Sequence, residues 1–217
     1  MTRPRLLDLF CCQGGAARGY QLAGFHVTGV DIEPQPRYIG DAFVQGDALE
    51  YVAAHGHEFD AIHASPPCQR YSVQTPMAYR GNHPDLIAPT RELLRASGKP
   101  YVIENVENAR ALLINPLKLC GSMFGLPVWR HRYFEIYPDT LLLTPACNHS
   151  NEPVLITGTT RRKPERGGRF DYTAQQCRDA AGCDWMTRKG LDEAIPPAFT
   201  EYIGAYLLQA ITEHVTA

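Results

Sequence analysis

The chain has 217 residues, enough for one large hydrophobic core with a small appendage but not for two full domains. Its formal net charge is −2 and its sequence pI is about 6.4, which excludes a protein that is basic all over. Any contact with nucleic acid therefore has to come from a local basic patch.

Seven cysteines, an odd number, are scattered without regular spacing, which favours reduced thiols in a cytoplasm over a disulfide framework. The first residues, MTRPR, lack the apolar stretch of a signal peptide, and no apolar run approaches the about 20 residues needed to cross a bilayer. We therefore expect a cytoplasmic monomer with no membrane partner.

The chain begins with a strand, a glycine turn and a helix. Residues 5–10 predict a buried strand, residues 11–15 a tight turn and residues 16–23 a helix. A second strand, over residues 26–31, ends in Asp31. In α/β folds such a turn lets the backbone approach a nucleoside, and the acid accepts from its ribose hydroxyls. A plain turn and a strand-ending acid would give the same pattern.

Residues 43–47 predict a third strand that ends in Asp47, and residues 48–55 a short helix. Asp47 stands where a carboxylate accepts a hydrogen bond from an adenine amino group. Because Asp is also a preferred N-cap residue, capping of the helix explains it equally well.

The stretch Ala64-Ser65-Pro66-Pro67-Cys68-Gln69 follows a predicted buried strand over residues 59–63. The two prolines break the strand and place Cys68 on a stiff loop at its carboxyl end, the edge where ligands bind in open α/β sheets. Cys68 is therefore a candidate nucleophile, although most free cysteines only fill space in a core. A polar and aromatic loop follows, and then a predicted helix over residues 84–97.

Two further predicted strands carry charged residues. Residues 100–106 form an apolar run with Glu104 near its carboxyl end. This carboxyl group is therefore either exposed at the edge of the sheet or kept there because it has a functional role. In residues 130–136, alternation places Arg130 and Arg132 on one face of a strand. Two arginines on one face indicate a nearby anion or polar base edge, or a solvated sheet edge.

From residue 138 to 178 the composition changes to Pro, Asn, Ser and Gly, which predicts a small irregular lobe. Residues 1–137 would form the α/β domain, and residues 179–217 would return to it through a final helix over residues 196–215. The lobe has a basic stretch that is either a solvated loop or a surface that contacts phosphates. Its residues are Arg161, Arg162, Lys163, Arg166 and Arg169.

Four residues of the lobe and its border, Cys147, His149, Cys177 and Cys183, offer ligand atoms for zinc. Their spacings, Cys-x-His and Cys-x5-Cys, are not the usual C-x2-C or H-x3-H. We therefore expect no metal.

Taken together, six short motifs occur in the order and approximate spacing of the cytosine-5 DNA methyltransferases, which the chain resembles from Asp8 to about Phe134 and again from Ala180. Each motif alone is weak, but the combination is specific. The motifs are Asp8-Leu9-Phe10-Cys11-Cys12-Gln13-Gly14-Gly15, Asp31-Ile32, Gly46-Asp47, Pro66-Pro67-Cys68-Gln69, Glu104-Asn105-Val106 and Arg130-His131-Arg132.

The resemblance implies the doubly wound, mostly parallel sheet of the class I S-adenosylmethionine-dependent methyltransferases. It implies that Cys68 adds to C6 of a flipped-out cytosine, that Glu104 acts on the ring, and that Arg130 and Arg132 orient the loop and the base. The residues it assigns to S-adenosylmethionine are Phe10, Gly14, Gly15, Asp31, Ile32, Asp47, Ala48 and Pro67.

Double-stranded DNA is the substrate that the resemblance implies, and a restriction system is the setting in which many such enzymes act. The same motifs fit methylation of cytosine in RNA. A third hypothesis is a module that binds cofactor or nucleic acid without turnover. It is favoured by departures from the family pattern at Cys12, where the family usually has glycine, and at Glu193, whereas the intact Cys68 and Glu104 oppose it. Val128 is a further departure from that pattern.

Overall fold

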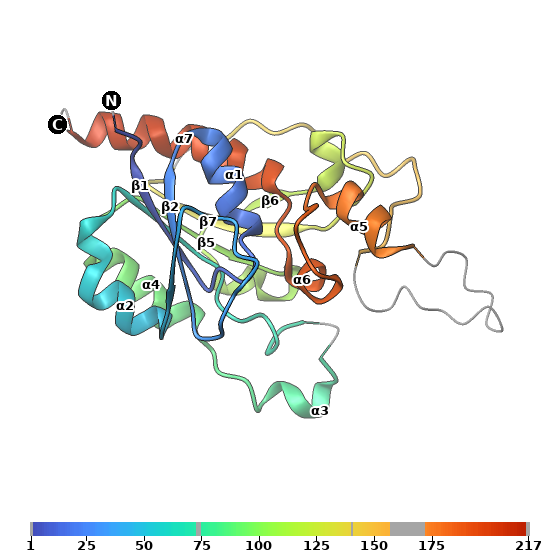
Figure 1. Ribbon diagram of the computed structural model, residues 1–217, viewed down its shortest axis with the longest axis horizontal. Coiled ribbons are helices and arrows are strands. Elements are labelled where there is room, and N and C mark those ends of the chain that lie inside the picture. The colour runs from blue at the N-terminus through green and yellow to red at the C-terminus, as the bar shows by residue number, and fades with distance from the viewer. Residues whose placement is uncertain (1, 73–74, 140, 157–171, 216–217) are drawn as a thin grey trace.

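The computed structural model describes residues 2–72, 75–139, 141–156 and 172–215, and its centre is one seven-stranded sheet with the order β3-β2-β1-β4-β5-β7-β6 (Figure 1). Strands β1 to β5 are parallel, and β7 lies antiparallel between β5 and β6. The predicted α/β class with a mostly parallel sheet is therefore confirmed. The strands are β1 (Arg5–Leu9), β2 (His26–Asp31), β3 (Ala42–Gln45), β4 (Ala61–Ala64), β5 (Tyr101–Asn105), β6 (Leu117–Leu119) and β7 (Arg132–Tyr137).

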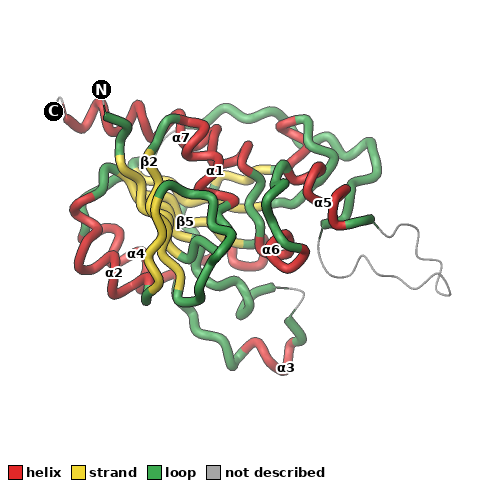
Figure 2. The backbone as a smooth tube through the Cα atoms, in the orientation of Figure 1, coloured by secondary structure: helices red, strands yellow, loops and turns green. Residues whose placement is uncertain are grey.

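Helices cover both faces of the sheet. Figure 2 shows α1 and α7 together on one side of the strands and α2 and α4 on the other. No helix in the described part of the chain is long and apolar enough to span a bilayer. The helices are α1 (Gly15–Ala23), α2 (Ala48–His55), α3 (Met77–Arg80), α4 (Ile87–Ala96), α5 (Ala174–Ala181), α6 (Arg188–Glu193) and α7 (Pro197–Val215), with short 3₁₀ turns at Gly56–Glu58, Glu107–Leu112 and Gly121–Phe124.

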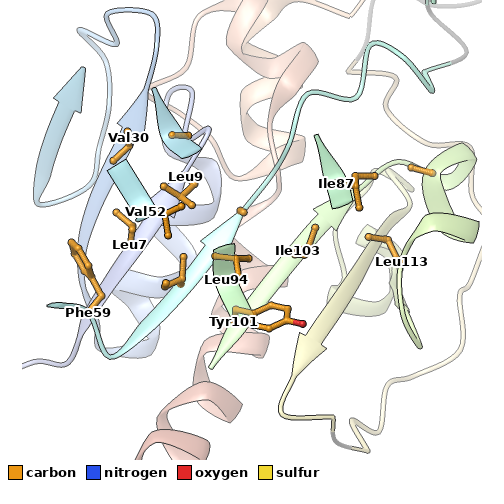
Figure 3. Packing of buried hydrophobic residues seen from close by; sticks show 14 of the residues in the cluster. Leu7, Leu9, Val30, Val52, Phe59, Ile87, Leu94, Tyr101, Ile103 and Leu113 are labelled. Carbon is orange, nitrogen blue, oxygen red and sulfur yellow. The ribbon is translucent and has the colours of Figure 1, made fainter. Parts of the chain in front are cut away.

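The central strands are continuous apolar runs because both of their faces are buried. Leu7 and Leu9 of β1 belong to a cluster with α2 and α4, part of which Figure 3 shows, whereas Leu6 belongs to a cluster with α1 and α7. Burying one such leucine fully stabilises the fold by about 1.5–3 kcal/mol. The two clusters hold the sheet rigid, and the carboxyl ends of its strands present the loops described below.

Helices α1 and α7 approach each other closely at Gly19. A Cβ atom built on Gly19 would lie 2.1 Å from the carbonyl oxygen of Pro197 and 2.1 Å from Thr200 Oγ1. Thr200 Oγ1 in turn donates a hydrogen bond of 2.9 Å to the carbonyl of Ala16. The first turn of α7 is therefore fixed directly on α1, beside the glycine turn that follows β1.

Several elements differ from the sequence-based prediction. Strand β6 and the helices α3, α5 and α6 were not predicted, and the helix expected over residues 84–97 spans only Ile87–Ala96. A signal for α5 was present, because Thr173 and Gln176 form a capping box at its start. Strand β6 has only three residues and carries no periodic pattern of its own.

Replacing Gly19 with alanine is expected to lower the free energy of unfolding by about 1–3 kcal/mol, because the added methyl group collides with backbone that cannot move away. Thermal unfolding would show this as a decrease in Tm of several degrees. Gly81→Ala is the matched control, since a Cβ at Gly81 meets nothing within 4 Å. Equal Tm values for the two variants would contradict the tight α1–α7 contact.

Candidate active site

The carboxyl ends of the parallel strands surround a cavity of about 830 Å³, within the range of about 300–1,000 Å³ typical of small-molecule sites. Most of the predicted site residues meet here, although they come from six separate stretches of chain. Gly14 lies just outside the lining, and Arg130 lines a neighbouring cavity. The predicted residues that line the large cavity are Phe10, Gly15, Asp31, Ile32, Asp47, Ala48, Pro67, Cys68, Glu104 and Arg132.

The two glycines of the turn after β1 are needed for different reasons. Gly14 caps α1 with φ of 82°, a left-handed conformation that favours glycine. Gly15 has no room for a side chain, because its Cβ would lie 2.5 Å from the carbonyl oxygen of Ile195. The turn is therefore held against the chain that leads into α7, and it forms one wall of the cavity.

Two residues of the same turn adopt left-handed backbone conformations without being glycine. These are Phe10, with φ of 58°, and Cys12, with φ of 46°. Such strain clusters at ligand sites. Glycine would adopt the conformation of Cys12 without this strain.

Asp31 is fixed at the end of β2 by backbone donors. Its Oδ2 accepts from the Cys12 amide at 2.9 Å, and its Oδ1 accepts from the Glu33 amide at 3.0 Å. Each carboxylate oxygen keeps capacity for one further donor. Asp31 thus presents a rigid acceptor to the cavity, as expected of a residue that binds ribose hydroxyls.

Asp8, which sequence reasoning did not single out as a site residue, is buried in the wall of the cavity. Burial, with a smaller contribution from Asp31, raises the pKa of its carboxyl group well above the usual value. Its Oδ2 atom is buried and has no hydrogen-bond partner among the described residues. A buried acceptor of this kind fits a ligand that brings a cationic or hydrogen-bond-donating group.

Asp47 is the N-cap of α2: its Oδ1 accepts from the amides of Leu49 at 2.8 Å and Glu50 at 3.0 Å. Of the two explanations left open by the sequence, capping is therefore confirmed. Its Oδ2 is not engaged by the cap. Asp47 also lines the cavity, so binding of an adenine amino group by Oδ2 stays a prediction.

The buried carboxyl group of Glu104 on β5 lies beside Arg132, the first residue of β7. Arg132 Nε is 2.8 Å from Glu104 Oε1. Burial raises the pKa of Glu104, whereas Arg132, Arg130 and a hydrogen bond from Ser65 lower it. Because the effect of burial is the larger, the pKa of Glu104 is raised. Glu104 therefore binds a proton more readily than an ordinary glutamate and suits the role of a general acid.

Cys68 shares this environment. The side chain of Asn105, next to Glu104, donates a 3.0 Å hydrogen bond to the carbonyl of Pro66, which joins the cysteine loop to β5. Burial and then the nearby Glu104 raise the pKa of the Cys68 thiol, while Arg132 acts in the opposite direction. In the free protein Cys68 is therefore a protonated thiol at neutral pH, and it has to lose its proton to act as a nucleophile.

A chain of buried polar side chains supports Ser65 and, through it, Glu104. The Tyr20 hydroxyl lies 2.9 Å from His63 Nδ1, and His63 Nε2 lies 2.9 Å from Ser65 Oγ. Burial lowers the pKa of His63 to about 3, so its ring is neutral. If Ser65 donates to Glu104, then Nε2 is the protonated nitrogen and Nδ1 accepts from Tyr20.

Arg130 does not lie where the sequence predicted it. Strand β7 begins only at Arg132, and Arg130 has φ of 31°, so alternation on one strand face does not apply. Its guanidinium instead donates to the carbonyl of Ala194 and, at 2.7 Å, to the carbonyl of Asp192. Burial lowers the pKa of Arg130 to about 9, which still leaves it charged at neutral pH. Arg130 therefore fixes the end of α6 beside the site.

A second cavity of about 580 Å³ adjoins the first. Cys68, Val106, Arg132 and Asp192 line both, so the thiol lies where the two meet. Arg130 and the residues 153–156 line only the second cavity. The arrangement offers two binding sites with one candidate nucleophile between them.

Sequence reasoning also missed residues from α6 and the turn before it. Gln13 is bound to this region by several hydrogen bonds: its Oε1 accepts from the Thr187 amide at 2.9 Å, its Nε2 donates to Thr187 Oγ1 at 3.0 Å, and its carbonyl accepts from Trp185 Nε1 at 2.7 Å. The predicted phosphate contacts Arg161, Arg162, Lys163, Arg166 and Arg169 lie outside the described residues.

Known proteins similar to this chain are methyltransferases. The type II methyltransferase M.XorII of Xanthomonas oryzae pv. oryzae is 29% identical over 152 residues, which are 62% of this chain and 31% of that protein. The ubiquinone biosynthesis O-methyltransferase of Aromatoleum aromaticum is 28% identical over 143 residues, 63% of this chain and 59% of that protein. The chain therefore spans less than two thirds of either relative. No protein-family profile matches it.

Among solved structures, the Dnmt2 methyltransferase of S. pombe superposes with a TM-score of 0.63 at 13% identity, over 96% of this chain and 99% of that one. This likeness confirms the predicted fold, the one that S-adenosylmethionine-dependent methyltransferases share. The cavity fits that cofactor in size. The acidic groups at the strand ends, and the buried Asp8 Oδ2 that has no hydrogen-bond partner among the described residues, fit its cationic and hydrogen-bonding parts.

The rate at which iodoacetamide alkylates Cys68 is expected to increase with pH and to level off only above about 8.5, the ordinary pKa of a thiol. In Arg132→Gln the pH at which the alkylation rate is half of its maximum should increase by about one unit or more, because the cation that favours the thiolate is gone. Mass spectrometry of the labelled peptide measures this rate.

The control is Arg91→Gln, which removes a 2.7 Å partner from the buried Glu135 on the same strand but away from the cavity. Its midpoint should match that of the unmodified protein. A midpoint below about 8 in the unmodified protein would contradict the environment described for Cys68.

Proposed function

We propose that this protein transfers a methyl group from S-adenosylmethionine to C5 of cytosine in DNA, through a transient bond between Cys68 and C6 of the base. The observation that carries the proposal is the position of Cys68 at the junction of two cavities, within the environment of Glu104 and Arg132. Similarity to M.XorII supports a nucleic-acid substrate.

The larger cavity would hold S-adenosylmethionine, which supplies an electrophilic methyl group when bound. Asp31 would accept from the ribose hydroxyls, Asp47 from the adenine amino group, and Asp8 from a donor at the buried end. Phe10 and the Gly14-Gly15 turn would shape the wall along which the ligand lies. The smaller cavity is then left for the base.

The type of each residue follows from the chemistry of cytosine. C5 is a weak nucleophile, and addition of the Cys68 thiolate at C6 moves electron density onto C5. A proton or hydrogen bond from Glu104 to N3 balances the negative charge that develops on the ring. Once C5 carries the methyl group, loss of the C5 proton and cleavage of the sulfur–C6 bond restore the aromatic ring.

A stacked base does not expose C6, so the cytosine has to rotate out of the helix into the smaller cavity. Arg132, which lines both cavities, is placed to orient the base. The long loop after Cys68, which contains α3, is a candidate for closing over the flipped base. Residues 138–178 would then form the lobe that recognises the target sequence.

Incubation with radiolabelled S-adenosylmethionine and either duplex DNA or tRNA tests the substrate class. We expect label in DNA, at cytosine C5, and base-resolution sequencing of methylated cytosines then gives the recognition site. If only tRNA is labelled, the substrate is RNA and not DNA. Binding of the cofactor without transfer to either would favour a non-catalytic module and refute the proposal.

Cys68→Ser is expected to reduce methyl transfer at least about 1,000-fold while leaving cofactor affinity nearly unchanged, because a hydroxyl is a far weaker nucleophile. Transfer is measured with labelled cofactor and affinity by calorimetry. Cys177→Ala is the matched control, since this buried thiol lines neither cavity. Transfer that survives in Cys68→Ser would rule out the covalent route.

Neutralising Arg161, Arg162 and Lys163 together is expected to weaken DNA binding and to reduce the slope of affinity against salt concentration, because fewer counterions are released. Fluorescence anisotropy at several salt concentrations measures both quantities. The control is the pair Arg95 and Lys99, changed to Gln, which lies at the end of α4 and just after it, outside the lobe and both cavities. An unchanged slope in the triple variant would make the basic stretch a solvated loop.

A further inference from the structure

Beside the second cavity, four metal-ligating side chains converge: Cys120, His131, Cys147 and His149. Their ligand atoms all lie within 4.8 Å of one another. Cys120 Sγ and His131 Nε2 each lie 3.3 Å from His149 Nε2, and Cys147 Sγ lies 3.8 Å from His131 Nε2. Two sulfur and two nitrogen atoms thus surround one point.

These spacings match a tetrahedral zinc site. With Zn–S bonds of about 2.3 Å and Zn–N bonds of about 2.0–2.1 Å, neighbouring ligand atoms lie about 3.3 Å to about 3.8 Å apart. The three separations given above, 3.3, 3.3 and 3.8 Å, fall in this range. The other three pairs of ligand atoms lie at most 4.8 Å apart, so they have to approach by no more than about 1–1.5 Å to complete the tetrahedron.

The sheet itself supplies two of the four ligands. Leu119, the last residue of β6, pairs with Arg132, the first residue of β7, so Cys120 directly follows and His131 directly precedes this pair. A 2.8 Å hydrogen bond from the Gly121 amide to the Trp129 carbonyl holds the two segments together just beyond them, one residue out of that register. These two ligands are therefore held by rigid backbone.

The other two ligands, Cys147 and His149, come from the irregular chain after β7, and their ligand atoms lie in the same cluster. Cys147 and His149 flank Asn148, whose amide donates a 3.1 Å hydrogen bond to Ser122 Oγ. The His149 ring stacks on Trp129 with centroids 4.2 Å apart. This stretch is thus already docked on the sheet edge with its ligand atoms facing Cys120 and His131.

We propose that Cys120, His131, Cys147 and His149 bind a structural Zn²⁺ ion. Tetrahedral S₂N₂ sets favour zinc, and four protein ligands leave no open position for catalysis. Binding releases the two thiol protons, so the two thiolates balance the charge of the ion. Cys120 is buried whereas His149 is exposed, which gives the ion a path of entry.

The ion would connect the site to the part of the chain that follows β7. His131 lies between Arg130 and Arg132, and residues 153–156, a few positions after His149, line the second cavity. Zinc would therefore fix one wall of the cavity in which we place the base. This consequence rests on the proposed function, whereas the zinc site itself does not.

The site departs from the expectation of no metal and from the ligand set considered in the sequence. Cys147 and His149 belong to both sets, but Cys177 and Cys183 are buried in a separate apolar cluster. The Cys177 thiol donates toward the carbonyl of Leu155 and the Cys183 thiol toward that of Ala181. The two ligands that join Cys147 and His149, namely Cys120 and His131, come together only when β6 and β7 pair.

The test measures zinc in the untagged protein, purified without chelator, by plasma mass spectrometry. We expect about one zinc per chain. Removing zinc with a chelator should lower Tm by about 5 °C or more, and adding Co²⁺ to the apo protein should give a thiolate-to-cobalt charge-transfer band with tetrahedral d–d bands. These measurements do not depend on enzyme activity.

Variants then identify the ligands. His149→Ala changes an exposed residue and should lose zinc at least about tenfold more readily, while His149→Cys, which supplies another ligand, should retain it. Cys147→Ser should lose zinc as well. Cys177→Ala and His55→Asn are matched controls outside the cluster, and both should keep about one zinc per chain.

Three results would overturn the proposal: folded protein with neither zinc nor a cobalt–thiolate band, zinc retained equally in His149→Ala and Cys147→Ser, or a disulfide between Cys120 and Cys147 in freshly purified protein. Zinc lost from Cys177→Ala would also contradict it. If zinc is present but no methyl transfer is found, the metal site holds and only the proposed function fails.

Discussion

The buried pair of Glu104 and Arg132 is the interaction on which the site depends. Removing a carboxylate from water costs several kcal/mol unless a cation accompanies it, and Arg132, 2.8 Å away, is that cation. The pair joins β5 to β7, so the antiparallel insertion of β7 beside β5 is what brings the arginine there. Cys68 reaches the same place through the contact of Asn105 with Pro66.

Elements determined by local pattern could be predicted from the sequence. Strands β1, β2, β4 and β5 are apolar runs because they are buried on both faces, and α2 has a capping aspartate at its start. Strand β6 and helix α6 are too short for a periodic signal. The alternation expected for Arg130 fails because a left-handed residue precedes the strand.

Within the candidate site, too, only the features that a local sequence pattern determines could be predicted. The motif residues at the strand ends could be predicted because parallel strands bring their carboxyl ends to one edge. The chain from Tyr20 through His63 to Ser65 could not, since it depends on α1 packing across β4. Likewise, the pairing of Cys120 with His131 is set by the β6–β7 register and not by spacing along the sequence.

The contact between Gln13 and Thr187 has a consequence for how the cavity forms during synthesis. These residues lie 174 positions apart, so the glycine turn is synthesised well before the opposite wall of the cavity. While the chain is still growing, β1 can pair with early strands and α1 can pack on them, but the pocket for a ligand is not yet enclosed. Ligand capture therefore begins only once the residues around α6 have left the ribosome and docked.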